Sequence, residues 1–235
     1  MSSSAPSSAP TVRTSVPGTR VILALDTSTD MLACAVARVT TASAQDNTAT
    51  TAIDVLATGD HLCRRRANVE LTATALETLA KARLAMADVD QVLVGRGPGS
   101  FTGVRIGIAT AKGLACGLAT TLLGASTLDA VAWTAWQAGQ RGRLAVVGDA
   151  MRKEVYPGVY LLDERGAHRT FEVERVRTVN AAIDELKARS DAGQLVLSGD
   201  GLKKYRTAFE GAGLSQVVDE NLWHPTGEGL IRASQ

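Results

Sequence analysis

The sequence predicts an α/β protein of two related lobes, because one order of secondary-structure elements occurs twice along the chain. Each copy runs strand, aspartate-containing turn, strand, strand, helix, strand, glycine turn, helix. The first copy starts at Val21 and the second at Arg143, and the first strand of each leads into an aspartate, Asp26 or Asp149. Such a duplication predicts that the two aspartates face a cleft shared by the lobes.

The first copy opens with a short apolar strand of the kind that is buried on both faces, Val21 to Leu25. The polar turn 26–30 follows, and the segment 40–51 contains few apolar residues, which indicates a loop insertion. The other elements predicted for this copy are the strands Met31 to Val39, Ala52 to Thr58, Val92 to Val94 and Thr120 to Leu123, a helix from Val69 to Met86 capped by Asn68, and a helix from Thr102 to Leu118.

A helix from Ser126 to Ala138 separates the two copies, and the second copy follows the plan of the first. Its predicted elements are the strands Arg143 to Gly148, Val155 to Leu161, Arg169 to Val173 and Gln194 to Leu197, a helix from Val179 to Arg189, and a last helix opened by Gly199-Asp200-Gly201.

The helix Thr102 to Leu118 is unusual because it carries four interior glycines, at 103, 107, 113 and 117. At roughly 0.5–1 kcal/mol each relative to alanine, they weaken the helix by about 2–4 kcal/mol. Close packing against another backbone can offset that loss. Ser100 or Thr102 can cap the helix, since either hydroxyl can accept an unpaired N–H of the first turn. Two interpretations remain open: the helix packs tightly inside the chain, or it binds a partner.

The helix Val69 to Met86 also carries more apolar surface than one sheet face can cover. Its apolar arc spans roughly 220°, against the ~100° that a one-sided surface helix requires. The two helices together therefore predict a partner interface. The residues expected in this interface are Leu71, Ala75, Leu79, Ala82, Gly103, Gly107, Ala111, Leu114 and Leu118.

The inventory of catalytic and metal-binding side chains is thin. The histidines at 61, 168 and 224 have no second histidine three or four residues away, so no metal site is expected. No serine or cysteine stands beside a base in the sequence, and no catalytic residue is expected. The cysteines at 34, 63 and 116 are interpreted as free thiols of a reducing cytosol, with Cys34 and Cys116 in apolar surroundings.

Charge and hydropathy argue against strong RNA binding by the isolated chain and against a membrane span. A net charge of +1 leaves little attraction for phosphates, so the isolated chain is expected to bind RNA weakly. The arginines at 64, 65 and 66 are interpreted as a solvated connection or as a contact with RNA or an acidic partner surface. Residues 1–19 lack a signal-peptide core and are expected to be disordered, and no apolar run is long enough for a membrane span.

The loop before the glycine-bearing helix carries the most specific pattern, GRGPGSFTGVRIG at 95–107. Together with ILALDTST at 22–29, DAMRKEVY at 149–156 and LVLSGDG at 195–201, it resembles the bacterial TsaB family of tRNA threonylcarbamoyladenosine biosynthesis proteins. The residues of the family's motif loop are Gly95, Arg96, Gly97, Pro98, Gly99, Ser100, Phe101, Thr102 and Gly103.

This resemblance implies a fold of two duplicated RNase H-like lobes, as in actin, sugar kinases and the Hsp70 ATPase (ASKHA). It also implies a non-catalytic cytoplasmic subunit that pairs with TsaD and works with the ATPase TsaE. That complex transfers a threonylcarbamoyl group to the adenosine beside the anticodon of tRNAs. The resemblance further implies that tRNA is bound only through the complex, that the chain can form a homodimer, and that it requires no cofactor.

The lobes are expected to span 20–122 and 123–224, with 225–235 returning to the first lobe as a helix shorter than is usual in the family. In ATPases of this fold, a carboxylate in the first turn helps to hold Mg²⁺. The alternative function is therefore a small ATPase that uses Asp26 and Asp149. No phosphate-binding lysine or arginine accompanies the turn Asp26, Thr27 and Ser28, which favours a vestigial cleft and leaves ATP or ADP binding open.

The glycine-rich loop fits neither of two common nucleotide motifs. A P-loop requires Gly-Lys-Ser/Thr where the chain has Ser100-Phe101-Thr102. The glycines at 97, 99 and 103 form only a relaxed dinucleotide fingerprint, and no acidic residue ends the next strand to hold a ribose.

Overall fold

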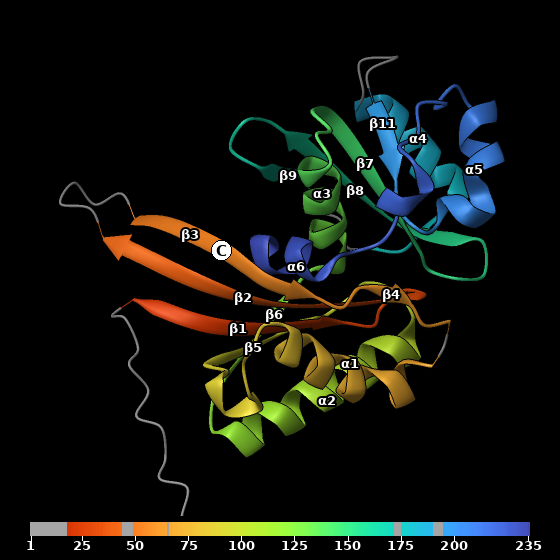
Figure 1. The fold of residues 1–235 in the computed structure, drawn as a ribbon. Coiled ribbons are helices and arrows are strands. Elements are labelled where there is room, and N and C mark those ends of the chain that lie inside the picture. Colours follow the sequence, from red (N-terminus) through yellow and green to blue (C-terminus); the bar gives the residue numbers. More distant parts are fainter. Residues whose placement is uncertain (1–17, 44–48, 65, 172–174, 190–194) are drawn as a thin grey trace, which may run out of the picture.

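The chain folds into two mixed β-sheets with helices on their faces, as the computed structural model shows (Figure 1). The described residues are 18–43, 49–64, 66–171, 175–189 and 195–235. Most of the tail expected to be disordered, 1–17, lies outside this set, as does Arg65.

The first sheet has six strands in the order β3-β2-β1-β5-β6, with the short β4 paired to β2. The pairs β1–β2 and β2–β3 are antiparallel, whereas β1–β5 and β5–β6 are parallel. The strands are β1 (Thr19–Asp26), β2 (Met31–Ser43), β3 (Ala49–Thr58), β4 (His61–Leu62), β5 (Gln91–Gly95) and β6 (Thr121–Ala125).

The second sheet has five strands in the order β10-β8-β7-β11, with β9 also paired to β8. Here β7–β8 and β8–β9 are antiparallel and β7–β11 is parallel. The strands are β7 (Gly142–Asp149), β8 (Glu154–Leu162), β9 (Ala167–Phe171), β10 (Arg177–Thr178) and β11 (Leu195–Ser198).

The two sheets repeat one topology, which confirms the predicted duplication. In each, a central strand forms a hairpin with its successor and pairs in parallel with a strand that follows a helix. The helices are α1 (Ala67–Lys81), α2 (Phe101–Leu118), α3 (Thr127–Gln137), α4 (Val179–Arg189), α5 (Leu202–Gly211) and α6 (Gly227–Ala233), with 3-10 turns at Met86–Asp88 and Glu220–Leu222.

Both faces of β1 are buried, as its continuous apolar sequence predicts. Leu23 and Leu25 belong to the core beneath α1 and α2, whereas Ile22 and Ala24 belong to the core beneath α6. Figure 1 shows α1 and α2 side by side on one face of the first sheet, and α3 and α6 between the two sheets. The lobe boundary at 122/123 stays a prediction; β6, which crosses it, pairs with β5 of the first sheet.

Two local predictions were wrong. Residues 40–43 and 49–51 of the predicted loop insertion at 40–51 are strand, because β2 continues to Ser43 and β3 begins at Ala49, with pairs such as Thr40–Ala52 and Thr41–Thr51. The rest of that prediction, 44–48, lies outside the described residues. Threonine favours strands through its β-branched side chain, and backbone pairing needs no apolar residue.

The helix predicted for 69–86 instead covers Ala67–Lys81, with Arg66 and not Asn68 at its N-cap. It ends because Arg83 takes a left-handed conformation (φ 57°) and Leu84 N–H donates to Leu79 O at 2.9 Å, as in a Schellman motif. Glycine usually occupies such a position, and its absence made the end invisible in the sequence. For α2, Ser100 is the cap, since its Oγ accepts from Gly103 N–H at 3.2 Å.

Candidate functional site

The first turn, which follows β1, is organised around a fully buried carboxylate. Asp26 is 0% exposed, and its Oδ1 accepts from Ser28 N–H at 2.7 Å. Its Oδ2 accepts from the hydroxyl of Thr127, the first residue of α3, at 2.7 Å. Burial raises the pKa of Asp26, and these hydrogen bonds oppose the shift. The carboxylate therefore joins β1 to α3 and has no surface left for a metal ion.

The glycines of the motif loop pack directly on this turn. A Cβ at Gly95 would lie 2.0 Å from Asp26 Oδ2, and one at Gly99 would lie 2.3 Å from Ser28 O. Ser100 N–H donates to the same Ser28 carbonyl at 2.7 Å. Only glycine permits this approach. The loop thus covers the first turn.

Two glycines of α2 continue the same contact. A Cβ at Gly103 would lie 2.0 Å from Thr27 O, and one at Gly107 would lie 2.7 Å from Thr27 Oγ1. Thr27 Oγ1 donates to Gly103 O at 2.7 Å. The internal-packing interpretation of the glycine helix therefore holds for its N-terminal half.

This packing corrects part of the predicted partner interface. Six of its nine residues are buried within the chain, against the first sheet or the first turn, and so cannot contact a partner in this conformation: Leu71, Ala75, Leu79, Gly103, Gly107 and Ala111. The physical reason is that the apolar stripe of each helix covers the chain's own sheet. Ala82, Leu114 and Leu118 are half-buried.

The outer face of α1 and α2 carries a different apolar set. Val69 and Leu76 on α1 are 65% and 51% exposed, and Phe101 at the start of α2 is 75% exposed. Gly113 and Gly117 are exposed too, and a Cβ on either would meet no atom within 4 Å. Their cost to helix stability is therefore not offset by packing within this chain.

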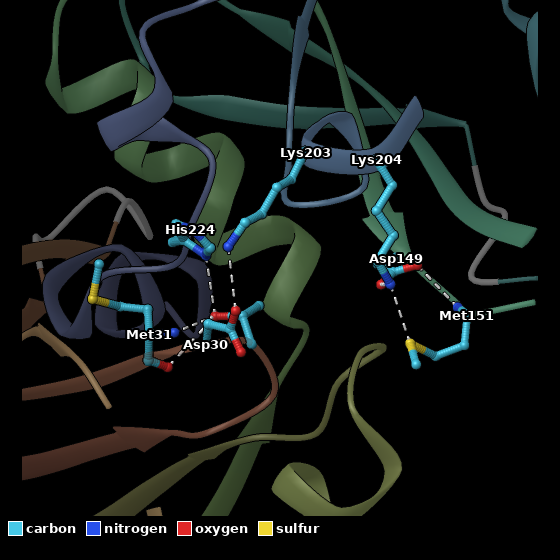
Figure 2. Close-up of polar contacts among 8 residues, drawn as sticks. Asp30, Met31, Asp149, Met151, Lys203, Lys204 and His224 are labelled. Atoms are coloured by element: carbon cyan, nitrogen blue, oxygen red, sulfur yellow. Dashed lines mark hydrogen bonds and ion pairs between the residues drawn. The ribbon is translucent and has the colours of Figure 1, made fainter. Parts of the chain in front are cut away.

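The second turn, which follows β7, has the opposite character. Asp149 lies beside Lys204 of α5, whose Nζ contacts Asp149 Oδ2 and, at 3.4 Å, Met151 Sδ (Figure 2). Asp149 N–H donates to Asp200 Oδ1 at 2.9 Å. Burial and the nearby charges of Asp149 and Asp30 raise the pKa of Asp200 to about 7. Within the described residues, no hydrogen bond joins Asp26 to Asp149.

A third group of polar contacts links the two lobes. Asp30, at the end of the first turn, lies with its Oδ2 3.6 Å from Lys203 Nζ of α5. The adjacent Thr29 Oγ1 lies 3.4 Å from Nδ1 of His224, in the connection to α6. Figure 2 shows these side chains meeting between the lobes. The sequence did not predict a role in this site for Lys203, Lys204 or His224. The Gly-Asp-Gly turn at 199–201, which is equivalent to the motif loop, was the pattern that could have pointed to Asp200.

The histidines and cysteines lie in separate surroundings. His61 contacts Glu70 at 3.1 Å and His168 contacts Asp163 at 3.1 Å. Cys34 is buried, and burial raises its pKa to about 12, so its thiol stays protonated. Cys116 is exposed, contrary to the prediction of apolar surroundings, because it lies on the outer face of α2. The described part of the chain contains no group of three or more potential metal ligands, and none of its helices combines the length and apolar content of a membrane span.

The duplicated sheets and the two aspartate turns define a protein of two RNase H-like lobes in the actin-like (ASKHA) class, in which the first turn is covered by its own glycine loop. A family profile described as "TsaD: tRNA N6-adenosine threonylcarbamoyltransferase" matches residues 61–218. The tRNA threonylcarbamoyladenosine biosynthesis protein TsaB of Escherichia coli is 33% identical over 170 residues, which cover 72% of each chain.

The TsaB of Buchnera aphidicola is 27% identical over 79% of this chain and 81% of its own. The solved structure of YeaZ from Pseudomonas aeruginosa matches with a TM-score of 0.66 and 28% identity, over 92% of this chain and 90% of that one. The chain belongs to the TsaB (YeaZ-type) family.

Proposed function

We propose that the chain is the non-catalytic subunit of the complex that installs threonylcarbamoyl on the adenosine beside the anticodon of tRNAs. In this complex it pairs with a TsaD subunit and works with a TsaE ATPase. The names of its relatives, TsaB proteins of tRNA threonylcarbamoyladenosine biosynthesis, support the pathway.

The observation that carries the pairing is the outer face of α1 and α2. It presents the exposed apolar residues Val69 and Leu76 on α1 and Phe101 at the start of α2. It also presents the exposed small residues Gly113 and Gly117 in the second half of α2, which allow another helix to approach closely. If two helices from each subunit pack together on this face, they would bury about 1,600 Å², the area of a standard interface. A second copy of the chain is an alternative occupant of the same face.

The first turn supports the non-catalytic part of the proposal. An ATPase of this fold needs an accessible carboxylate there, whereas both oxygens of Asp26 accept from protein donors and its surface is fully buried. The alternative of a small ATPase using Asp26 and Asp149 is therefore disfavoured. Asp149 is engaged by Lys204.

Charge placed on the outer face tests the pairing. In Leu76→Glu and Gly113→Glu, the new carboxylate would be desolvated in the interface without a partner, so capture by TsaD of the same organism should fall at least about tenfold. Leu161→Glu is the matched control, since Leu161 is an exposed apolar residue of the second sheet. Capture of both variants at the wild-type level, with their folds intact by circular dichroism, would place the pairing surface elsewhere.

Substitutions at Ala75 or Ala111 are unsuitable for this test. Both residues are fully buried in the core beneath α1 and α2, so a charge there should unfold the chain whether or not a partner binds.

A further inference from the structure

Three basic segments that are far apart in the sequence converge where the two lobes meet. Arg64 follows β4, and its backbone N–H lies 3.4 Å from Asp30 O. The same Asp30 receives Lys203 of α5 at 3.6 Å. The next residue of α5, Lys204, reaches Asp149 at the turn between β7 and β8 (Figure 2). That turn carries Arg152 and Lys153, so the fold brings all three segments to one rim.

Some charges on this rim are already matched. Lys203 and Lys204 pair with Asp30 and Asp149, and Arg66 pairs with Glu70 at 2.9 Å. Arg64, Arg152 and Lys153 are exposed, and none of them belongs to an ion pair in the described parts of the chain. Among the nearby carboxylates, Glu154 is half-buried and Asp200 accepts the Asp149 N–H. Three cations are therefore available to an anionic partner.

The β7–β8 turn holds the backbone of two of these cationic residues in place. Met151, Arg152 and Lys153 have left-handed backbones, with φ values of 65°, 50° and 64°. Non-glycine residues rarely adopt this conformation, and such residues persist where the surrounding structure imposes it. Lys153 N–H donates to Tyr205 Oη at 3.2 Å, and Met151 N–H donates to Asp149 Oδ1 at 3.0 Å. A turn held in this way loses less entropy when it binds.

We propose that Arg64, Arg152 and Lys153 form a phosphate-binding rim for the tRNA on which the complex acts, an inference that rests on the proposed function. RNA fits these cations better than an acidic protein does. Phosphate contacts gain affinity one cation at a time through counterion release. Protein interfaces depend on a buried apolar centre. Among the described residues, the large apolar ones exposed next to these cations in the sequence are two, Leu62 and Met151, which is little for such a centre.

A site of three cations is compatible with the chain's net charge of +1. Three phosphate contacts give weak binding by the isolated chain, and they add to the affinity of a complex whose other subunit also holds the tRNA.

The test compares two triple variants in complex with TsaD of the same organism. Arg64→Ala/Arg152→Ala/Lys153→Ala removes the rim. Arg20→Ala/Arg143→Ala/Lys187→Ala removes three exposed cations elsewhere. Arg20 and Arg143 are the second residues of β1 and β7, far from the aspartate ends of these strands. Filter binding of an unmodified tRNA transcript at several salt concentrations gives the affinity and its salt dependence.

The rim variant should bind the transcript about tenfold more weakly, and its plot of log affinity against log salt concentration should be shallower by about two. Its capture by TsaD should equal that of the wild type, and the control variant should bind the transcript with wild-type affinity. Equal affinity of the rim variant and the wild type would overturn the inference. Loss of TsaD capture with unchanged RNA binding would show that the rim contacts protein, which also overturns it.

Failure of the proposed function gives a different result. If the wild-type chain does not assemble with TsaD, the pairing is wrong. The inference is then tested on the isolated chain at low salt. It holds if the rim variant binds the transcript more weakly than the wild type and the control variant binds it equally well.

Discussion

At the scale of the residue, two aspartates at equivalent strand ends have acquired opposite environments. Asp26 is sealed beneath the glycine loop and bonded to Ser28 and Thr127, whereas Asp149 is partly exposed and paired with Lys204. The sequence placed both aspartates correctly at the ends of matching strands. It did not show which is accessible, because that depends on the packing of a loop some 70 residues further along the chain.

The carboxyl of Asp200 makes stability depend on pH. Its folded pKa of about 7 lies above the ordinary 3.8, so across this interval the folded chain holds a proton that the unfolded chain has released. The free energy of unfolding should therefore fall as pH rises from about 4 to 7.

Asp200→Asn should flatten that slope, because the amide oxygen can still accept the Asp149 N–H and carries no charge. Urea unfolding at several pH values should show a gain at pH 7 relative to wild type, on the order of 4 kcal/mol, and little difference at pH 4. Parallel curves for the two proteins would show that Asp200 titrates normally.

At the scale of the element, α2 uses its glycines in two ways. Gly103 and Gly107 lie against Thr27, and any side chain there would collide with it, whereas Gly113 and Gly117 face open space. The sequence predicted Gly103 and Gly107 in a closely packed surface but could not tell whether that surface met the chain's own turn or a partner.

Alanine substitutions should separate the two uses by the sign of their effect. Gly103→Ala should lower the free energy of unfolding by about 1–3 kcal/mol through overpacking against Thr27 O. Gly113→Ala should raise it by about 0.5–1 kcal/mol through helix propensity. Thermal and urea unfolding check both values, and a stabilising Gly103→Ala would show that the contact with the first turn is not as close as described here.

The elements that the sequence predicted well are those with a strong apolar pattern, such as β1 and α3. Those it missed depend on chemistry that the pattern does not contain. The threonine pairs that extend β2 and β3 carry little hydrophobic signal. Helix α1 ends at Lys81, two residues before Arg83, whose left-handed conformation usually belongs to glycine.

At the scale of the whole molecule, α3 and α6 join the lobes through buried contacts. Ala130 of α3 packs in the core of the first sheet, while Val131 packs in the core of the second. Thr134 of α3 and Thr226 before α6 share a hydrogen bond of 2.9 Å. The internal repeat predicted two lobes, but it did not predict these contacts between them. The residues involved lie on α3 and α6, which belong to neither copy of the repeated order of elements.

The central claim is that the chain supports a reaction performed by its partner. Transfer of threonylcarbamoyl from an activated threonylcarbamoyl donor to an unmodified tRNA transcript measures it most directly, with this chain, TsaD and TsaE of the same organism supplied separately and together. We predict no transfer by the chain alone and transfer by the complete mixture. Transfer by the chain alone that disappears with Asp149→Ala would contradict the account and assign the chemistry to its own cleft.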